Sequence, residues 1–184
     1  MRIGKKWYEG TADAIFQNMN LIDDEDPDQV CIFGGDHIYR MDVRQMLRFH
    51  SKRQAVLTVA AIRVPIQDAH HFGIIEVDEE WRMTGFIEKP ESAPKTIPGN
   101  PDYVLASMGN YIFERGPLVD ELKKDSKDKN SDHDFGKNIL PKMSYAQTVT
   151  PKTPKRYFWR PKCYRLSIRL FGRVNFVDSP KHVP

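Results

Sequence analysis

The most informative stretch of the sequence is Val30-Cys31-Ile32-Phe33-Gly34-Gly35-Asp36-His37. A short continuous apolar run that stops at two glycines is typical of a strand buried on both faces. Ligands bind outside the carboxyl ends of strands in open α/β sheets, and glycine lets the backbone approach them closely. Asp36 could therefore hold Mg²⁺ against phosphate oxygens. An equally good reading is that Asp36 only caps a turn.

Helices and strands alternate on both sides of this stretch. We expect helices near residues 11–21, 41–50, 117–124 and 135–143, with Thr11 and Asp42 as N-caps. Strands are expected at residues 55–64 and 103–113, and residues 73–77 and 83–88 should form a hairpin, while four prolines make residues 90–101 a loop. The alternation predicts an α/β domain with a parallel or mixed sheet covered on both faces.

A second candidate site follows the hairpin, at Phe86-Ile87-Glu88-Lys89-Pro90. Glu88 could accept hydrogen bonds from sugar hydroxyls while Lys89 holds a phosphate. On this segment alone, a surface charge pair is the better reading. The acids and histidine of residues 131–137 suggest a metal site, but they lack zinc-ligand spacing, and an N-cap with acids in the first helical turn explains most of them.

Composition restricts the class of protein. The chain has 184 residues, 40% hydrophobic and 29% charged, which suits one soluble domain. No run of 18 apolar residues occurs, and the first ten residues hold no apolar stretch, so we expect neither a membrane span nor a secretory signal. Two cysteines, Cys31 and Cys163, make no disulfide framework. A reducing, cytoplasmic location fits best.

The net charge of +3 comes from the end of the chain. Residues 155–184 hold eight Lys and Arg against the single acid Asp178, whereas the rest holds 20 basic and 24 acidic residues. The main body is therefore mildly acidic. Aromatic and aliphatic residues interleave with the basic ones, unlike a disordered basic arm. We therefore expect no nucleic-acid partner, although a polyanion-binding tail is a distant alternative.

Together these segments resemble the bacterial-type ADP-glucose pyrophosphorylases (glucose-1-phosphate adenylyltransferases). The resemblance covers residues 5–145, in family order and spacing. The matching stretches are Trp7-Tyr8-Glu9-Gly10-Thr11-Ala12-Asp13-Ala14, Gly35-Asp36-His37-Ile38-Tyr39, Val64-Pro65-Ile66 with Phe72-Gly73, Phe86-Ile87-Glu88-Lys89-Pro90, Leu105-Ala106-Ser107-Met108-Gly109 and His133-Asp134-Phe135-Gly136-Lys137. The resemblance implies a Rossmann-like, glycosyltransferase-A-like mixed sheet, incomplete at its N-terminus. Residues 1–150 would be a partial catalytic domain and 151–184 an atypical basic tail.

The resemblance also implies an activity and a set of site residues. The family joins ATP and glucose 1-phosphate into ADP-glucose and pyrophosphate for glycogen or starch synthesis, with Mg²⁺, and its full-length members are homo-oligomers. Asp36 would be the catalytic and metal-binding carboxylate, and Gly10 and Thr11 would lie near the nucleotide. The residues implied for the glucose 1-phosphate pocket are Tyr8, Gly73, Glu88, Lys89 and Ser107, with Lys89 on the phosphate and Glu88 on the hydroxyls.

The sequence departs from the family at both ends. The Gly-rich loop that holds the ATP phosphates would precede residue 1. At the other end, the family reads Tyr-Trp-Arg-Asp-Val-Gly-Thr, whose Asp is the second metal ligand, but Trp159-Arg160 is followed here by Pro161-Lys162. We hypothesise that a reading-frame disturbance, later restored, produced residues 161–173. The coding DNA tests this, because a shifted frame across the stretch should encode an Asp-Val-Gly-Thr-like sequence.

Other functions remain open. The chain could belong to a related enzyme that uses another base, such as a mannose-1-phosphate guanylyltransferase. It could also be a catalytically silent, sugar-phosphate-binding regulatory subunit.

The departures predict that the 184-residue chain alone forms negligible ADP-glucose. Mg²⁺-ATP would lack one of its two carboxylates and the loop for its phosphates, so most of the positioning that catalyses phosphoryl transfer would be missing. Chromatography of chain incubated with ATP, glucose 1-phosphate and Mg²⁺ checks this. Any ADP-glucose above a no-protein blank contradicts the prediction.

Overall fold

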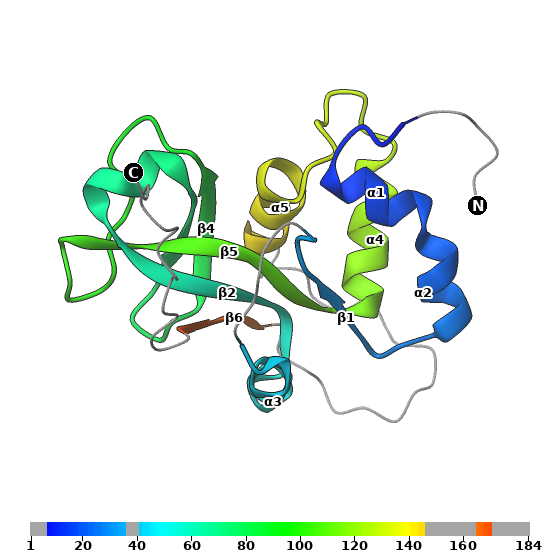
Figure 1. Ribbon diagram of the computed structural model, residues 1–184, viewed down its shortest axis with the longest axis horizontal. Coiled ribbons are helices and arrows are strands. Elements are labelled where there is room, and N and C mark those ends of the chain that lie inside the picture. The colour runs from blue at the N-terminus through cyan, green and yellow to red at the C-terminus, as the bar shows by residue number, and fades with distance from the viewer. Residues whose placement is uncertain (1–6, 36–40, 146–164, 171–184) are drawn as a thin grey trace, which may run out of the picture.

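The computed structural model describes residues 7–35, 41–145 and 165–170, the last of these as backbone only (Figure 1). The sheet is built from β1 (Gln29–Ile32), β2 (Ala55–Pro65), β3 (Gly73–Val77), β4 (Met83–Glu88), β5 (Tyr103–Glu114) and β6 (Arg165–Leu170). The helical elements are α1 (Thr11–Gln17), α2 (Met19–Glu25), α3 (Val43–Arg53), the 3₁₀ helix η1 (Ile66–His71), α4 (Arg115–Asp125), the π-helical turn η2 (Phe135–Ile139) and α5 (Leu140–Tyr145).

The long strand β5 organises the sheet. The strand order is β4-β3-β5-β2-β6. β3 pairs with the first part of β5, at Leu105 and Ala106, and β1 pairs with its last part, from Tyr111 to Glu114. The β2–β6 pair is parallel and the other described pairs are antiparallel, so the sheet is mixed. Between Val59 and Ala61 the register shifts, and three residues of β5 oppose one residue of β2. The expected α/β fold with a mixed sheet is confirmed.

Helices cover both faces of the sheet. On one face, Leu57, Ile75 and Phe113 pack in the larger core with α1, α4, η2 and α5. On the opposite face, Met46 of α3 packs on Ala60 and Ile112, and η1 contributes to a smaller apolar cluster. Figure 1 shows α3 on the side of the sheet away from α4 and α5. The period-2 alternation of each strand explains these two cores.

The expectation that residues 30–33 form a strand buried on both faces is wrong. β1 ends at Ile32, none of its residues is fully buried, and Cys31 is exposed. Within the described part of the chain β1 pairs only with β5, so one edge of it has no neighbouring strand. Val30 and Ile32 contact the larger core from one side only. A continuous apolar run therefore marks the strand but overstates its burial.

The two predicted N-caps have different outcomes. Asp42 caps α3, since its carboxylate accepts a hydrogen bond from the Arg44 backbone N–H at 3.0 Å. Thr11 is the first helical residue of α1, the cap position is Gly10, and no side chain caps that end. The Thr11 hydroxyl is engaged elsewhere, in a contact described below. In the described residues, no helix is both long and apolar enough to cross a bilayer.

Phe113 tests the larger core. Its side chain is 0% exposed and contacts the rings of Tyr111 and Phe135. We expect Phe113→Ala to lower the free energy of unfolding by about 3–5 kcal/mol, because the substitution removes buried surface and leaves a cavity. Urea unfolding measures this. Leu21→Ala, at a side chain 60% exposed, is the control and should change stability by about 0.5 kcal/mol or less. Equal effects of the two substitutions would contradict this packing.

Candidate sugar-phosphate site

Three of the predicted site residues form one row across the sheet. Glu88 of β4 pairs with Gly73 of β3. The β3–β5 register pairs Ile74 with Ala106, so Ser107 follows beside Gly73. Residues opposite one another in antiparallel strands project from the same face. Glu88, Gly73 and Ser107 therefore share the face that bears the larger core, at the end of the sheet where β4 stops.

Two side chains of β4 closely approach Gly73 in this row. A Cβ atom at position 73 would lie 2.5 Å from the Phe86 ring and 2.7 Å from Glu88 Oε2. Both distances are shorter than a real Cβ atom accepts, so the ends of the Phe86 and Glu88 side chains would have to move if residue 73 had a side chain. The missing side chain leaves room for the Glu88 carboxylate above β3. A second glycine, Gly136, also lies close to this carboxylate. A Cβ built there would be 2.8 Å from Glu88 Oε2.

The Glu88 carboxylate lies in an unfavourable place for a charge. Burial raises its pKa above the usual 4.5, and the nearby Asp134 carboxylate raises it further. Lys89 and Lys137 act in the opposite direction without cancelling the shift. Two acids and two bases thus gather at the end of β4. A ligand that donates hydrogen bonds to the two carboxylates would relieve their repulsion.

Lys89 leaves the strand in an unusual backbone conformation. Its φ is +45°, in the left-handed region, although the following Pro90 favours an extended preceding residue. A hydrogen bond from the Lys89 N–H to the Phe72 carbonyl, 3.0 Å long, holds this turn. The Lys89 side chain is exposed. Strained backbone of this kind is concentrated at functional sites.

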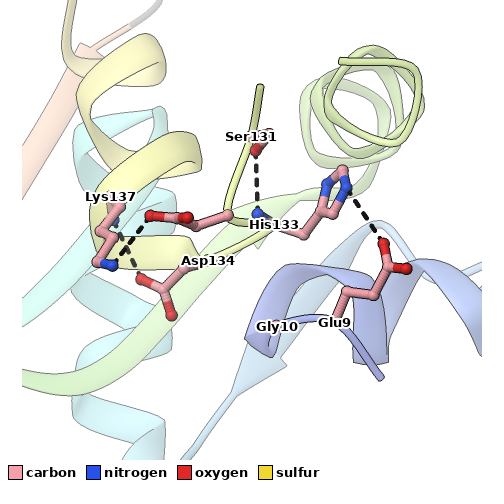
Figure 2. A pocket seen from close by; sticks show the side chains of 7 residues that line it. Glu9, Gly10, Ser131, His133, Asp134 and Lys137 are labelled. Atoms are coloured by element: carbon pink, nitrogen blue, oxygen red, sulfur yellow. Dashed lines mark hydrogen bonds and ion pairs between the residues drawn. The ribbon is translucent and has the colours of Figure 1, made fainter. Parts of the chain in front are cut away.

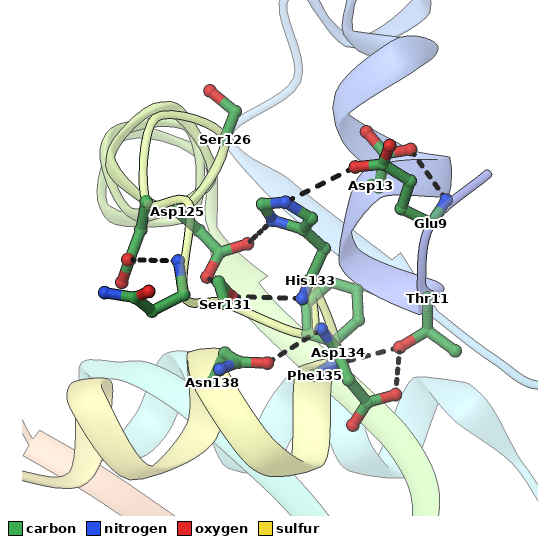
Figure 3. A network of polar contacts seen from close by, with 12 residues as sticks. Glu9, Thr11, Asp13, Asp125, Ser126, Ser131, His133, Asp134, Phe135 and Asn138 are labelled. Carbon is green, nitrogen blue, oxygen red and sulfur yellow. Dashed lines mark hydrogen bonds and ion pairs between the residues drawn. The ribbon is translucent and has the colours of Figure 1, made fainter. Parts of the chain in front are cut away.

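The segment before η2 joins this row to the start of α1. The Asp134 side chain caps η2 by accepting a hydrogen bond from the Lys137 N–H at 3.1 Å. The Thr11 hydroxyl donates to Asp134 Oδ2 at 2.9 Å and accepts from the Phe135 N–H at 3.0 Å. Figure 3 shows Thr11 between these two neighbours. This bond explains why Thr11 does not cap its own helix.

Gly10 lies against the same segment. A Cβ there would lie 2.3 Å from the His133 carbonyl oxygen, so no other residue allows the contact. An open pocket of about 520 Å³ adjoins it, shown in Figure 2. The lining residues are Glu9, Gly10, Ser131, Asp132, His133, Asp134 and Lys137. Its Lys137 ammonium forms an ion pair with Asp132 at 2.9 Å.

The remaining predicted residues lie elsewhere. The Tyr8 hydroxyl accepts a hydrogen bond from Asn18 at 3.2 Å, at the α1–α2 junction rather than beside Glu88. Asp36 lies outside the described residues. β1, which leads toward it, ends opposite Tyr111, four residues from Ser107 along β5. The described residues hold no group of three His, Cys, Asp or Glu side chains able to bind a metal, so Mg²⁺ binding at Asp36 stays a prediction.

The sequence analysis interpreted the acids of residues 131–137 as a helix N-cap and its first turn, and it did not place Asp134 or Lys137 near Glu88. The cap is present, and the same two residues also lie beside Glu88. Their residue types alone did not reveal this, because 46 residues separate Asp134 from Glu88 in the sequence. The available signal was Gly136, a glycine inside a helical turn, which indicates a close approach by another group.

A mixed sheet with helices on both faces and an acid–lysine pair at the end of one strand is compatible with a sugar-phosphate-binding transferase. The sequence match agrees, and the chain belongs to the nucleotidyl transferase family, which it matches over residues 3–160.

Two similar curated proteins are both named glucose-1-phosphate adenylyltransferase. Glucose-1-phosphate adenylyltransferase 1 of Vibrio vulnificus (strain YJ016) is 62% identical over 143 residues, which cover 78% of this chain and 35% of that protein. Glucose-1-phosphate adenylyltransferase of Anaeromyxobacter dehalogenans (strain 2CP-C) is 58% identical over 149 residues, covering 81% of this chain and 36% of the relative. The chain thus matches only about a third of the length of these relatives.

The raised pKa of Glu88 predicts that the ionised Glu88 carboxylate lowers the free energy of unfolding, by an amount that depends on pH. Below the usual 4.5, Glu88 is protonated whether folded or unfolded, and the cost is absent. As the pH rises from there through the raised folded pKa, the folded chain holds the extra proton and its stability falls. Glu88→Gln should therefore gain stability relative to wild type as the pH rises above the usual 4.5 and through the raised folded pKa, measured by thermal unfolding across pH.

Asp42→Asn provides a control of opposite sign. The hydrogen bond from the Arg44 side chain holds the pKa of Asp42 below its usual value, and asparagine also caps helices well. The Asp42→Asn variant should be less stable than wild type at neutral pH. This difference should shrink as the pH falls through the folded pKa of Asp42. A Glu88→Gln profile parallel to that of Asp42→Asn would contradict the environment described for Glu88.

Proposed function

We propose that this chain binds glucose 1-phosphate, as the sugar-phosphate part of a nucleotidyltransferase that makes ADP-glucose and pyrophosphate from ATP. The main support is the row of Glu88, Gly73 and Ser107, with Lys89 at the strand end and Asp134 facing Glu88. The names of the relatives supply the substrate, since the row itself fits any small sugar phosphate.

The chemistry of the row suits the two ends of such a ligand. Ionised carboxylates only accept hydrogen bonds, and sugar hydroxyls donate them. Glu88 and Asp134 together would bind hydroxyls, and each new donor would offset the repulsion between the two charges. Lys89, exposed at the end of β4, would pair with the phosphate as a compact point charge. Gly73 leaves room for the Glu88 carboxylate above β3, where it would meet the sugar hydroxyls.

The nucleotide would lie on the side of Gly10 and Thr11. Both residues border the pocket or the Asp134 carboxylate, so a nucleotide there would be adjacent to the sugar phosphate. The sugar phosphate would then attack the α-phosphorus of ATP in line, and pyrophosphate would leave. Catalysis of this kind depends on positioning and charge neutralisation. We assign Asp36 the catalytic and Mg²⁺-binding role on the family resemblance alone, and Tyr8 a place in the sugar pocket on the same ground.

A catalytically silent sugar-phosphate-binding subunit is the second candidate. The row of Glu88, Gly73 and Ser107 favours it, because those residues would bind a sugar phosphate without any catalytic step. The two candidates share the same binding site and differ in turnover. Saturable glucose 1-phosphate binding without ADP-glucose formation supports the silent subunit.

Calorimetric titration with glucose 1-phosphate tests the site itself. Lys89→Ala should weaken binding by about 10- to 100-fold, the equivalent of one lost charge-assisted bond to phosphate. Lys123→Ala, which removes an exposed lysine from α4, is the matched control and should bind like wild type. Unchanged affinity in Lys89→Ala would remove Lys89 from the site, and a wild-type chain that does not bind would refute the proposed function.

A further inference from the structure

His133 is part of a network of polar contacts that the proposed chemistry does not use. Its Nδ1 lies 2.8 Å from Asp125 Oδ2, and its Nε2 lies 3.6 Å from Glu9 Oε2 (Figure 3). The Asp125 side chain, at the end of α4, is 3% exposed. Glu9 immediately precedes the Gly10 cap of α1. The imidazole therefore links the end of one helix to the start of another.

The backbone of His133 makes a second connection to α1. Its carbonyl oxygen accepts hydrogen bonds from the N–H groups of Ala12, at 2.7 Å, and Asp13, at 3.3 Å. These are first-turn donors of α1 that its own Gly10 cap leaves unsatisfied. Gly10 is pressed against the same carbonyl. His133 therefore contacts the start of α1 twice, through its imidazole at Glu9 and through its carbonyl at the first-turn N–H groups.

Ser131 fixes the His133 backbone from the other side. Its hydroxyl donates to Asp125 Oδ1 at 2.6 Å and accepts from the His133 N–H at 3.0 Å. His133 itself has a φ of +53°, in the left-handed region where histidine and asparagine are better tolerated than most residues. The buried Asp125 carboxylate is therefore an anchor from which Ser131 and His133 extend together.

We propose that His133 is a positioning residue for the sugar-phosphate site. By holding the start of α1 on residues 131–135, it keeps the Thr11 hydroxyl in the 2.9 Å hydrogen bond that orients the Asp134 carboxylate toward Glu88. The inference rests on the proposed function, because it assigns Asp134 a part in ligand binding. His133 touches no substrate in this scheme, and it acts through Thr11.

Two substitutions at His133 separate the side chain from the backbone. Glycine tolerates the left-handed conformation, so His133→Gly removes both imidazole contacts without adding strain. Asparagine also tolerates that conformation and places a donor near the position of Nδ1, so His133→Asn keeps a bond to Asp125. We expect His133→Gly to weaken glucose 1-phosphate binding by about tenfold, as one lost positioning contact would. His133→Asn should restore affinity to within about threefold of wild type.

A double-mutant cycle with Thr11→Val distinguishes positioning from a general loss of stability. Valine removes the hydroxyl that bonds Asp134 and leaves His133 untouched. If His133 acts through Thr11, the double variant His133→Gly/Thr11→Val should bind no more weakly than the weaker of the two single variants. Hydrogen exchange should also quicken at the Ala12 and Phe135 amides in His133→Gly, and at Phe135 in Thr11→Val.

The outcomes separate this inference from the proposed function. A wild-type chain that fails to bind glucose 1-phosphate in calorimetry overturns both. Wild-type binding with equal affinity in His133→Gly, or in Thr11→Val, overturns the role of His133 alone. Additive losses in the double variant, or a His133→Asn variant as weak as His133→Gly, do the same. Should His133→Gly not fold, as judged by circular dichroism, Thr11→Val and His133→Asn still decide the question.

Discussion

The contact on which the rest of the site depends is the Glu88 carboxylate held between two glycines. Gly73 below it and Gly136 beside it both lack the carbon atom that would occupy its place. A methyl group at either position would displace the carboxylate or the backbone, because cores and close contacts accommodate added volume poorly. The Glu88 carboxylate can take this place because both positions are glycine, and there the charge of Asp134 raises its pKa.

This close approach unites two regions of the chain that serve different purposes. The sheet contributes a rigid row, since each member is set by strand register. The segment before η2 contributes side chains whose positions come from hydrogen bonds with α1 and α4. Sites placed on regular elements are held more firmly than sites on loops. The carboxylate on the sheet is therefore fixed by the backbone, whereas its neighbour Asp134 is fixed by a chain of polar side chains.

Local sequence patterns were enough to locate most elements: apolar runs marked the hairpin strands, prolines marked the loop, and the residue type of Asp42 marked the α3 cap. They failed where a residue's role depends on a distant partner. Thr11 looks like a helix cap until Asp134 is known to lie beside it, 123 residues away. Cys31 looks buried until β1 is known to pair on one side only among the described strands. Local sequence indicates which conformation a segment prefers, whereas tertiary contacts determine the hydrogen bonding of Thr11 and the exposure of Cys31.

The register shift in the middle of the sheet has a mechanical consequence. Because three residues of β5 oppose only Ala60, the register shift divides the strand into two segments, and Gly109 at the shift has a left-handed φ of +69°. The first segment pairs with β3 and the second with β1, along the same edge. Ser107 belongs to the first segment, and β1, which leads toward Asp36, belongs to the second. A small change of bend at Gly109 would therefore alter the separation between the sugar-facing strands and β1 while each segment kept its own hydrogen bonds.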